Sequence, residues 1–278
     1  MKTTFLSLFI SILLFSCSSD DDTSNNTPEP ETQNKSYFPT AINNSWTYQN
    51  TSQIEGHDNK SQNQEKIHIA DSHNKENTTF YTFQSNLSFE NQGLVTGALT
   101  TGELAEVNKE LIYNGNFKVD LSPLGIGEYI EIPITNLIIY KSDADKNTIL
   151  AEISGTHQQD VNWQMSAPIP LTLNYSITSK QNESPNEFEV NSTTYTDVIS
   201  AALSIEIKLD ASLLGLSIPI MKPQEAVIST NYFAKDVGLI HSKTTTHYVV
   251  EDLSNFGVLN IPDFRLISSQ DLIDYNLQ

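Results

Sequence analysis

Short alternations of apolar and polar residues dominate the chain from Tyr37 to Gln278. Trp46-Thr47-Tyr48, Ile67-His68-Ile69 and Ile130-Glu131-Ile132 place apolar side chains two residues apart. This spacing predicts β-strands that bury one face and expose the other. Apolar or β-branched runs predict further strands at residues 80–83, 111–119, 136–140, 149–153, 171–177, 188–190, 204–209, 227–233 and 243–250. Asn114-Gly115-Asn116 predicts a hairpin that divides the run at 111–119.

Helical periodicity is sparse. Residues 102–113 place Leu104, Val107, Leu111 and Ile112 on one helical face, and residues 195–203 allow a short helix, although Thr-rich flanks favour extension there. We therefore predict an all-β fold, a single large curved antiparallel sheet or open barrel with few or short helices. The polar stretch 180–187 fits either a loop within this domain or an interdomain linker.

The first residues have the pattern of a secretory signal. The apolar stretch from Phe5 to Phe15 is about 16 Å long as a helix, too short for a hydrocarbon core of about 30 Å. Leu14-Phe15-Ser16-Cys17 then resembles the lipobox of bacterial lipoproteins, which implies that Cys17 carries a diacylglycerol and a further acyl chain such as palmitate. The alternative is an ordinary secretory signal that contains a Cys by chance.

An acidic cluster follows the lipobox. Ser18, Ser19, Asp20, Asp21 and Asp22 resemble the surface-export signal of Bacteroidota lipoproteins, although they also fit the solvated start of a linker. We expect residues 1–16 to be a lipoprotein signal peptide, 17–36 a lipidated Cys with a disordered tether, and 37–278 one β-rich domain. The resemblance implies an outer-membrane protein that is lipid-anchored and exposed at the cell surface, with the membrane as a partner through the lipid anchor.

The composition excludes several classes. The chain has 34 acidic and 15 basic residues, a net charge of -19, one Cys and one Arg, Arg265. One Cys excludes a disulfide scaffold and a Cys-ligated metal site. The acidic balance argues against nucleic acid as a partner, since phosphate binding needs basic clusters.

No established catalytic motif is present in the sequence. Ser72 and Lys75 match S-x-x-K within a polar segment that we interpret as a hairpin loop, and the six His residues form no metal-binding pair. Asp143, Asp145 and Asn147 match the start of a calcium loop, but Thr148 and Ser154 replace its Gly and Glu. We therefore predict no catalytic residues, no metal site and no cofactor, and we expect that the protein is not an enzyme.

Three apolar stretches contain Pro: residues 121–126, 167–173 and 213–221. They fit the mouth of a hydrophobic cavity, a partner surface, or ordinary core at the open end of the sheet. Two of them belong to a pattern that occurs twice, at residues 120–134 and 210–220. It reads D-x-S-x-L-G-aliphatic followed by I-P-I, and it fits either an internal repeat or a coincidence of composition. Trp46 and Trp163 would stack on sugars if exposed, but burial is the expectation.

Three segments together resemble uncharacterised surface lipoproteins of Bacteroidota, including flavobacteria. These are residues 37–48 (YFP…NSWTY), 190–199 (VNSTTYTDVI) and 232–240 (YFAKDVGLI), about 30 residues spread along the body. The resemblance implies a curved antiparallel sheet like those of lipoprotein-carrier and lipocalin-like proteins. Such sheets often enclose an apolar cavity.

Three functional hypotheses remain from the sequence. The first is a non-enzymatic, lipid-anchored envelope protein that binds an apolar small molecule or a protein partner. The second is an accessory carbohydrate-binding surface lipoprotein that uses exposed aromatic side chains. The third is a hydrolase with an unrecognised carboxylate site.

Overall fold

The computed structural model describes residues 36–127, 129–163, 168–213, 215–254 and 261–278. All of them belong to one compact unit, Asn34–Gln278. The predicted signal peptide, Cys17 and the cluster from Ser18 to Asp22 lie outside the described residues, so those predictions stand on the sequence alone.

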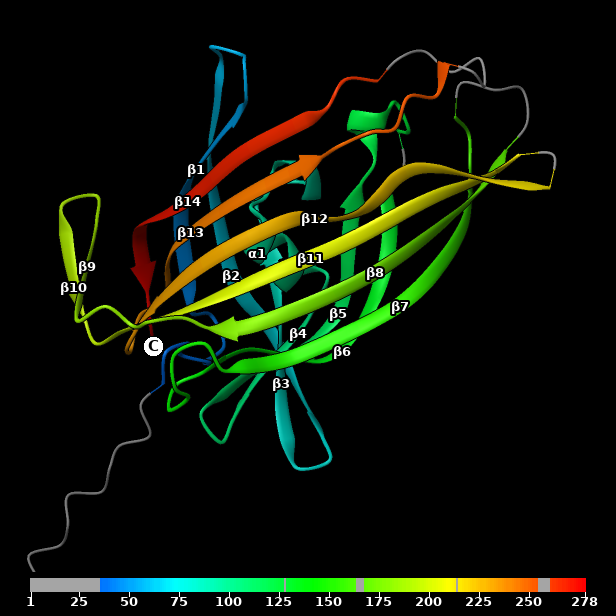
Figure 1. Ribbon diagram of the computed structural model, residues 1–278. Coiled ribbons are helices and arrows are strands. Elements are labelled where there is room, and N and C mark those ends of the chain that lie inside the picture. The colour runs from blue at the N-terminus through cyan, green and yellow to red at the C-terminus, as the bar shows by residue number, and fades with distance from the viewer. Residues whose placement is uncertain (1–35, 128, 164–167, 214, 255–260) are drawn as a thin grey trace, which may run out of the picture. The chain divides into compact units, whose positions relative to one another are not determined.

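The body is one twelve-stranded antiparallel sheet in the order β6-β5-β4-β3-β2-β1-β14-β13-β12-β11-β8-β7. Figure 1 shows this sheet curving around the helix α1, and the sheet is nearly closed. The strands are β1 Ser45–Ile54, β2 Lys60–Lys75, β3 Thr78–Ser85, β4 Gly102–Val107, β5 Glu110–Asp120, β6 Tyr129–Lys141, β7 Ile149–Val161, β8 Ile169–Gln181, β11 Val198–Leu213, β12 Leu216–Ala234, β13 Gly238–Tyr248 and β14 Phe264–Asn276. The predicted all-β curved sheet is confirmed.

Smaller elements complete the body: a separate hairpin of β9 Glu187–Val190 and β10 Thr193–Thr196, the 3-10 helices η1 Phe89–Asn91 and η2 Ser122–Leu124, and α1 Leu94–Thr100. Within the described residues, no helix has the length and apolarity needed to cross a membrane.

Side-chain contacts join β6, one end of the sheet, to β7 and β8 at the other end. The Ser179 hydroxyl on β8 donates to the carbonyl of Ile138 on β6, and the Lys141 amide donates to Gln181 Oε1 at 3.2 Å. Gln159 Nε2 on β7 donates to the carbonyl of Tyr129 at 3.4 Å. We call this line of contacts the seam.

The inward-facing side chains form two apolar clusters with a polar belt between them. One cluster contains Leu121, Trp163, Leu171 and Ile205, and the other contains Trp46, Phe83, Leu104 and Phe233. The polar belt runs in register across β2, β1, β14, β13 and β12, through Asn63, Asn50, Gln270, Ser242 and Asn231. A second row beside it contains Ser268, Thr244 and Ser229, and Ser179 extends it to β8 through Leu203.

The hairpin predicted at Asn114-Gly115-Asn116 is wrong, because β5 continues through these residues. Gly115 lies opposite Gly102 on β4, and a Cβ on Gly115 would come within 2.3 Å of the Tyr113 hydroxyl. The irregularity is instead a bulge on β6, where Asn136 has φ 56° and its amide donates to Asn114 Oδ1 at 2.7 Å.

The helix predicted at residues 102–113 is also wrong. The segment forms β4 and β5, joined at Asn108 and Lys109, which have φ values of 51° and 69°. Such a turn matches the twist of the paired strands. The segment from Tyr195 to Leu203 forms the end of β10 and the start of β11, with Asp197 between them, and contains no helix, as its Thr-rich flanks indicated.

The segment around Ser72 and Lys75 was expected to be a hairpin loop, yet β2 extends to Lys75. The turn is limited to Glu76 and Asn77, both with positive φ. His73 lies within the strand, with Nε2 3.0 Å from Glu103 Oε2.

The Pro-containing stretches are largely core. Leu121, Leu124, Leu171 and Ile220 are fully buried in the first apolar cluster. Pro170 and Pro219 lie within β8 and β12. Both tryptophans are buried as expected: the indole N–H of Trp46 donates to the carbonyl of Val237 at 2.6 Å, and that of Trp163 to the carbonyl of Leu124 at 2.9 Å.

Candidate functional site: an apolar pocket beneath α1

A pocket of about 190 Å³ lies between the concave face of the sheet and the segment from η1 to α1. Its floor comes from β11 to β14 and includes Ile205, Val227, Thr246, Tyr248 and Leu266. Phe117 and Val119 of β5 form one side. An engineered apolar cavity of about 150 Å³ holds a benzene molecule, so this pocket has room for a slender apolar group. It is below the ~300 Å³ at the small end of sites that enclose a whole drug-sized ligand.

Residues of α1 cover the pocket. Leu94 and Ala98 line it, and the same two side chains and Phe117 also line a smaller void of about 30 Å³. The other face of α1 is buried, with Val95 and Leu99 in the second apolar cluster. The helix therefore separates the pocket from the second cluster.

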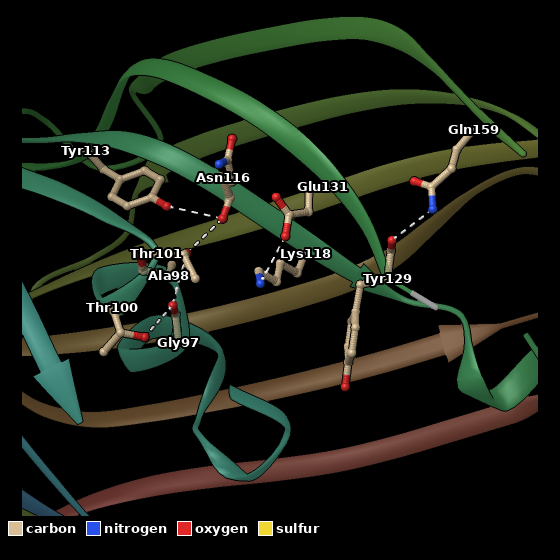
Figure 2. Close-up of polar contacts among 10 residues, drawn as sticks. All are labelled: Gly97, Ala98, Thr100, Thr101, Tyr113, Asn116, Lys118, Tyr129, Glu131 and Gln159. Carbon is tan, nitrogen blue, oxygen red and sulfur yellow. Dashed lines mark hydrogen bonds and ion pairs between the residues drawn. The ribbon is translucent and has the colours of Figure 1, made fainter. Parts of the chain in front are cut away.

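Hydrogen bonds tie the end of α1 to β5, as Figure 2 shows. The carbonyl of Asn116 accepts from the Thr101 hydroxyl at 2.8 Å and from the Tyr113 hydroxyl at 3.4 Å. Burial raises the pKa of Tyr113 to about 12, and the bonds to Thr101 and Asn116 partly oppose this. The bond from Thr101, the C-cap residue of α1, therefore ties the end of the helix to β5.

The start of α1 is held by a buried carboxylate, Glu65, beside the polar belt. Glu65 Oε2 accepts from the Gly93 amide at 3.1 Å and from the Thr96 hydroxyl at 2.8 Å. Asn50 Nδ2 at 2.8 Å and Gln270 Nε2 at 3.3 Å donate to the same oxygen. Glu65 has no exposed surface, and neutral donors from β1, β14 and the start of α1 surround its carboxylate.

The mouth of the pocket is aromatic and acidic. Lys118 Nζ lies 5.1 Å from the centre of the Phe89 ring and 3.0 Å from Glu131 Oε1. The ring of Tyr129 meets that of Phe89 edge to face, with centroids 5.5 Å apart. Two further carboxylates, Glu90 and Asp120, line the pocket beside these rings.

Both of these carboxylates influence the neighbouring groups. Burial, then the charges of Asp120 and Glu90, raise the pKa of Tyr129. Burial and the Asp120 charge likewise raise the pKa of Tyr248, whose hydroxyl donates to the Asp120 carbonyl at 3.1 Å. The Glu90 backbone and the Ser88 side chain lower the pKa of Glu90 by hydrogen bonding. The mouth is therefore negative at neutral pH.

The other residues considered from the sequence lie elsewhere. Asp143 pairs with Lys109 at 3.2 Å in the exposed connection between β6 and β7, where a loop was expected. His241 and His247 share β13, and His241 Nδ1 lies 2.6 Å from Asp271 Oδ1 among the rings of Phe188 and Tyr232. Among the described residues, no three His, Cys, Asp or Glu side chains converge as a metal site would require.

Sequence reasoning missed most of the pocket, because its residues come from distant segments. Of the Pro-containing stretches, only the first reaches it, through Pro123. The segment from Phe89 to Ala98 gave no helical signal, and β14 was not predicted at all. Glu65 and Gln270 each lie two residues before a buried apolar residue, Ile67 and Leu272. Extending the period-two alternation by one step would have placed both on the buried face.

The sequence matches no family model and no curated protein. Similar solved structures include a "putative lipoprotein" from Parabacteroides distasonis, with 12% identity over 87% of this chain and 99% of that chain and a TM-score of 0.40. A "putative exported protein" with a YmcC-like fold from Bacteroides fragilis has 9% identity over 87% and 100% of the two chains and a TM-score of 0.33. A LolA superfamily protein from Nitrosomonas europaea has 10% identity over 87% and 89% and a TM-score of 0.20. Likeness at this level establishes neither a family nor a function.

Proposed function

We propose that this chain is a lipid-anchored, non-catalytic protein of the cell envelope that binds a slender apolar group in the pocket beneath α1. The lipobox-like Cys17 and the acidic residues that follow it support anchoring at the outer membrane with exposure at the cell surface. The pocket itself carries the binding part of the proposal. Its size favours a chain or ring that enters from one end, and not a whole ligand enclosed on all sides.

The carbohydrate-binding alternative has less support. Trp46 and Trp163 are buried, and the rings of Phe188 and Tyr232 stack on each other with centroids 4.0 Å apart. A sugar-binding platform needs free ring faces. The pocket is therefore the better candidate for a ligand.

Anchoring is tested by replacing the thiol. We expect Cys17→Ser to abolish incorporation of labelled palmitate, because the hydroxyl cannot form the thioether that precedes signal cleavage. Metabolic labelling followed by gel autoradiography measures this in cells that make either chain. Palmitate labelling that persists in the variant would contradict the anchor.

Binding is tested with decan-1-ol, an uncharged probe with a slender chain. The unit Asn34–Gln278 contains the whole described sheet and both apolar clusters, so we expect it to fold by itself and to bind the alcohol in isothermal titration calorimetry. Ala98→Phe fills the space that Ala98 lines and should weaken binding by about tenfold or more. The matched control is Ala144→Phe, which makes the same change in the connection between β6 and β7.

Two results would overturn the binding proposal. One is absence of decan-1-ol binding to the unaltered unit. The other is equal binding by the Ala98→Phe and Ala144→Phe variants, with far-ultraviolet circular dichroism showing that both are folded.

A further inference from the structure

The pocket beneath α1 has an apolar interior and a mouth with more acidic than basic side chains. Among the described residues that line it, Lys118 carries the one basic side chain, while Glu90 and Asp120 carry carboxylates. Glu131 already neutralises Lys118 at 3.0 Å. The charges left over at the mouth are therefore negative.

Asp120 is held in place by its own turn. Its carboxylate accepts from the Ser122 amide at 2.8 Å and from the Ser122 hydroxyl at 3.0 Å, and neither donor carries a charge. Glu90 lies on η1 and is exposed. A fixed carboxylate and an exposed one thus lie at the mouth near the same aromatic ring, and both act on the Tyr129 hydroxyl.

The chain already places an ammonium group at this mouth. Lys118 Nζ lies over the Phe89 ring, which has the geometry of a cation–π contact. The aromatic rings and carboxylates are therefore arranged in a way that stabilises a cation. An anion at the same place would meet the carboxylates and the field of a chain whose net charge is -19.

We propose that the ligand of this pocket is a cationic amphiphile, a slender apolar chain that ends in an ammonium group, and not a fatty-acid anion. The chain occupies the space between Phe117, Val227 and Leu266. The ammonium group remains at the mouth, near Glu90, Asp120 and the face of an aromatic ring. This inference rests on the proposed function, since it names the ligand class of the same pocket.

The test compares three probes of equal chain length: decylammonium, decan-1-ol and decanoate. At low ionic strength and pH 7, we expect the unit Asn34–Gln278 to bind decylammonium about tenfold or more tighter than decanoate, with decan-1-ol between them. Added salt should reduce the difference, because it screens charges at an exposed mouth.

Two variants locate the effect. Glu90→Gln with Asp120→Asn removes both charges and should bring the ratio of decylammonium to decanoate affinity to within about threefold. Asp143→Asn with Glu183→Gln removes two charges in exposed ion pairs outside the pocket and should keep the full ratio. If the first double variant fails to fold, the exposed Glu90→Gln change alone should still lower the ratio.

The outcomes separate the two proposals. Binding of decan-1-ol together with equal or tighter binding of decanoate overturns the cationic ligand and leaves the apolar pocket in place. Failure of decan-1-ol itself to bind overturns the proposed function. An equal loss of selectivity in both double variants assigns the preference to net charge alone and also contradicts the inference.

Discussion

Glu65 illustrates how a single polar side chain positions the candidate site. Its carboxylate is fully buried, and the partners described for it are neutral donors: Asn50, Ser85, Gly93, Thr96 and Gln270. These donors come from β1, β3, β14 and the start of α1. One side chain therefore links the helix that covers the pocket to three strands of the sheet.

We expect Glu65→Gln to lower the free energy of unfolding by about 2–4 kcal/mol, because the new amide group directs hydrogens toward groups that are themselves donors. Urea unfolding followed by circular dichroism measures the change. Glu55→Gln is the control, since Glu55 forms an exposed pair with Arg265 and should change stability by no more than about 0.5 kcal/mol. Equal effects of the two substitutions would contradict the role of Glu65.

Gly93, whose amide donates to Glu65, also packs against Gln270. A Cβ at this position would lie 1.7 Å from Gln270 Cδ, so the chain requires Gly where the loop passes the polar belt. Gln270 Oε1 is buried without a hydrogen-bond partner among the described residues. The polar belt is thus packed closely around α1.

At the scale of elements, strands were predictable and the helix was not. Period-two alternation identified β1, β2 and β6 correctly, and apolar or β-branched runs identified β8 and β12, because one face of each strand is buried. The helix α1 has the sequence LVTGALT, whose Thr and Gly have low helical propensity, and only tertiary contacts account for it. The strand β14 was missed because Ser268, Ser269 and Gln270 make its centre polar, although this polar run lies inside the sheet between β1 and β13.

The two similar segments at residues 120–134 and 210–220 occupy similar places in the sheet. Each of these two copies connects neighbouring antiparallel strands, β5 to β6 and β11 to β12. Gly125 and Gly215, at equivalent positions, have φ values of 74° and 79°. Left-handed turns explain why Gly occurs in both copies. The first copy contains η2, whereas in the second the strand β11 continues to Leu213, so the likeness does not extend to the whole connection.

At the scale of the whole molecule, the two apolar clusters and the polar belt divide the interior of the sheet. Polar interiors of this kind are compatible with folding when most of their donors and acceptors are matched. Ser229, Asn231, Ser242 and Thr244 meet this condition through mutual hydrogen bonds of 2.8–3.3 Å. The sequence showed these residues only as exceptions to an apolar pattern, so the belt could not be identified before the strand register was known.

The seam is where the nearly closed sheet should open most easily. β13 is paired on both sides, whereas β6 and β7 are the ends of the strand order. At the seam, Gln159 of β7 donates to the Tyr129 carbonyl of β6, and Ser179 and Gln181 of β8 form hydrogen bonds with Ile138 and Lys141 of β6. Amides at unpaired edges lack the protection of a continuous ladder.

We therefore expect amides on the seam side of β7 to exchange with solvent faster than those of β13, as measured residue by residue by NMR. Ser179→Ala should accelerate exchange near Ile138 by about fivefold, the equivalent of about 1 kcal/mol. Ser176→Ala, on the opposite face of β8, is the control and should leave these rates unchanged. Equal protection of β7 and β13 would mean that strand pairing, and not side chains, closes the sheet, and that α1 and the pocket lie within a continuous barrel.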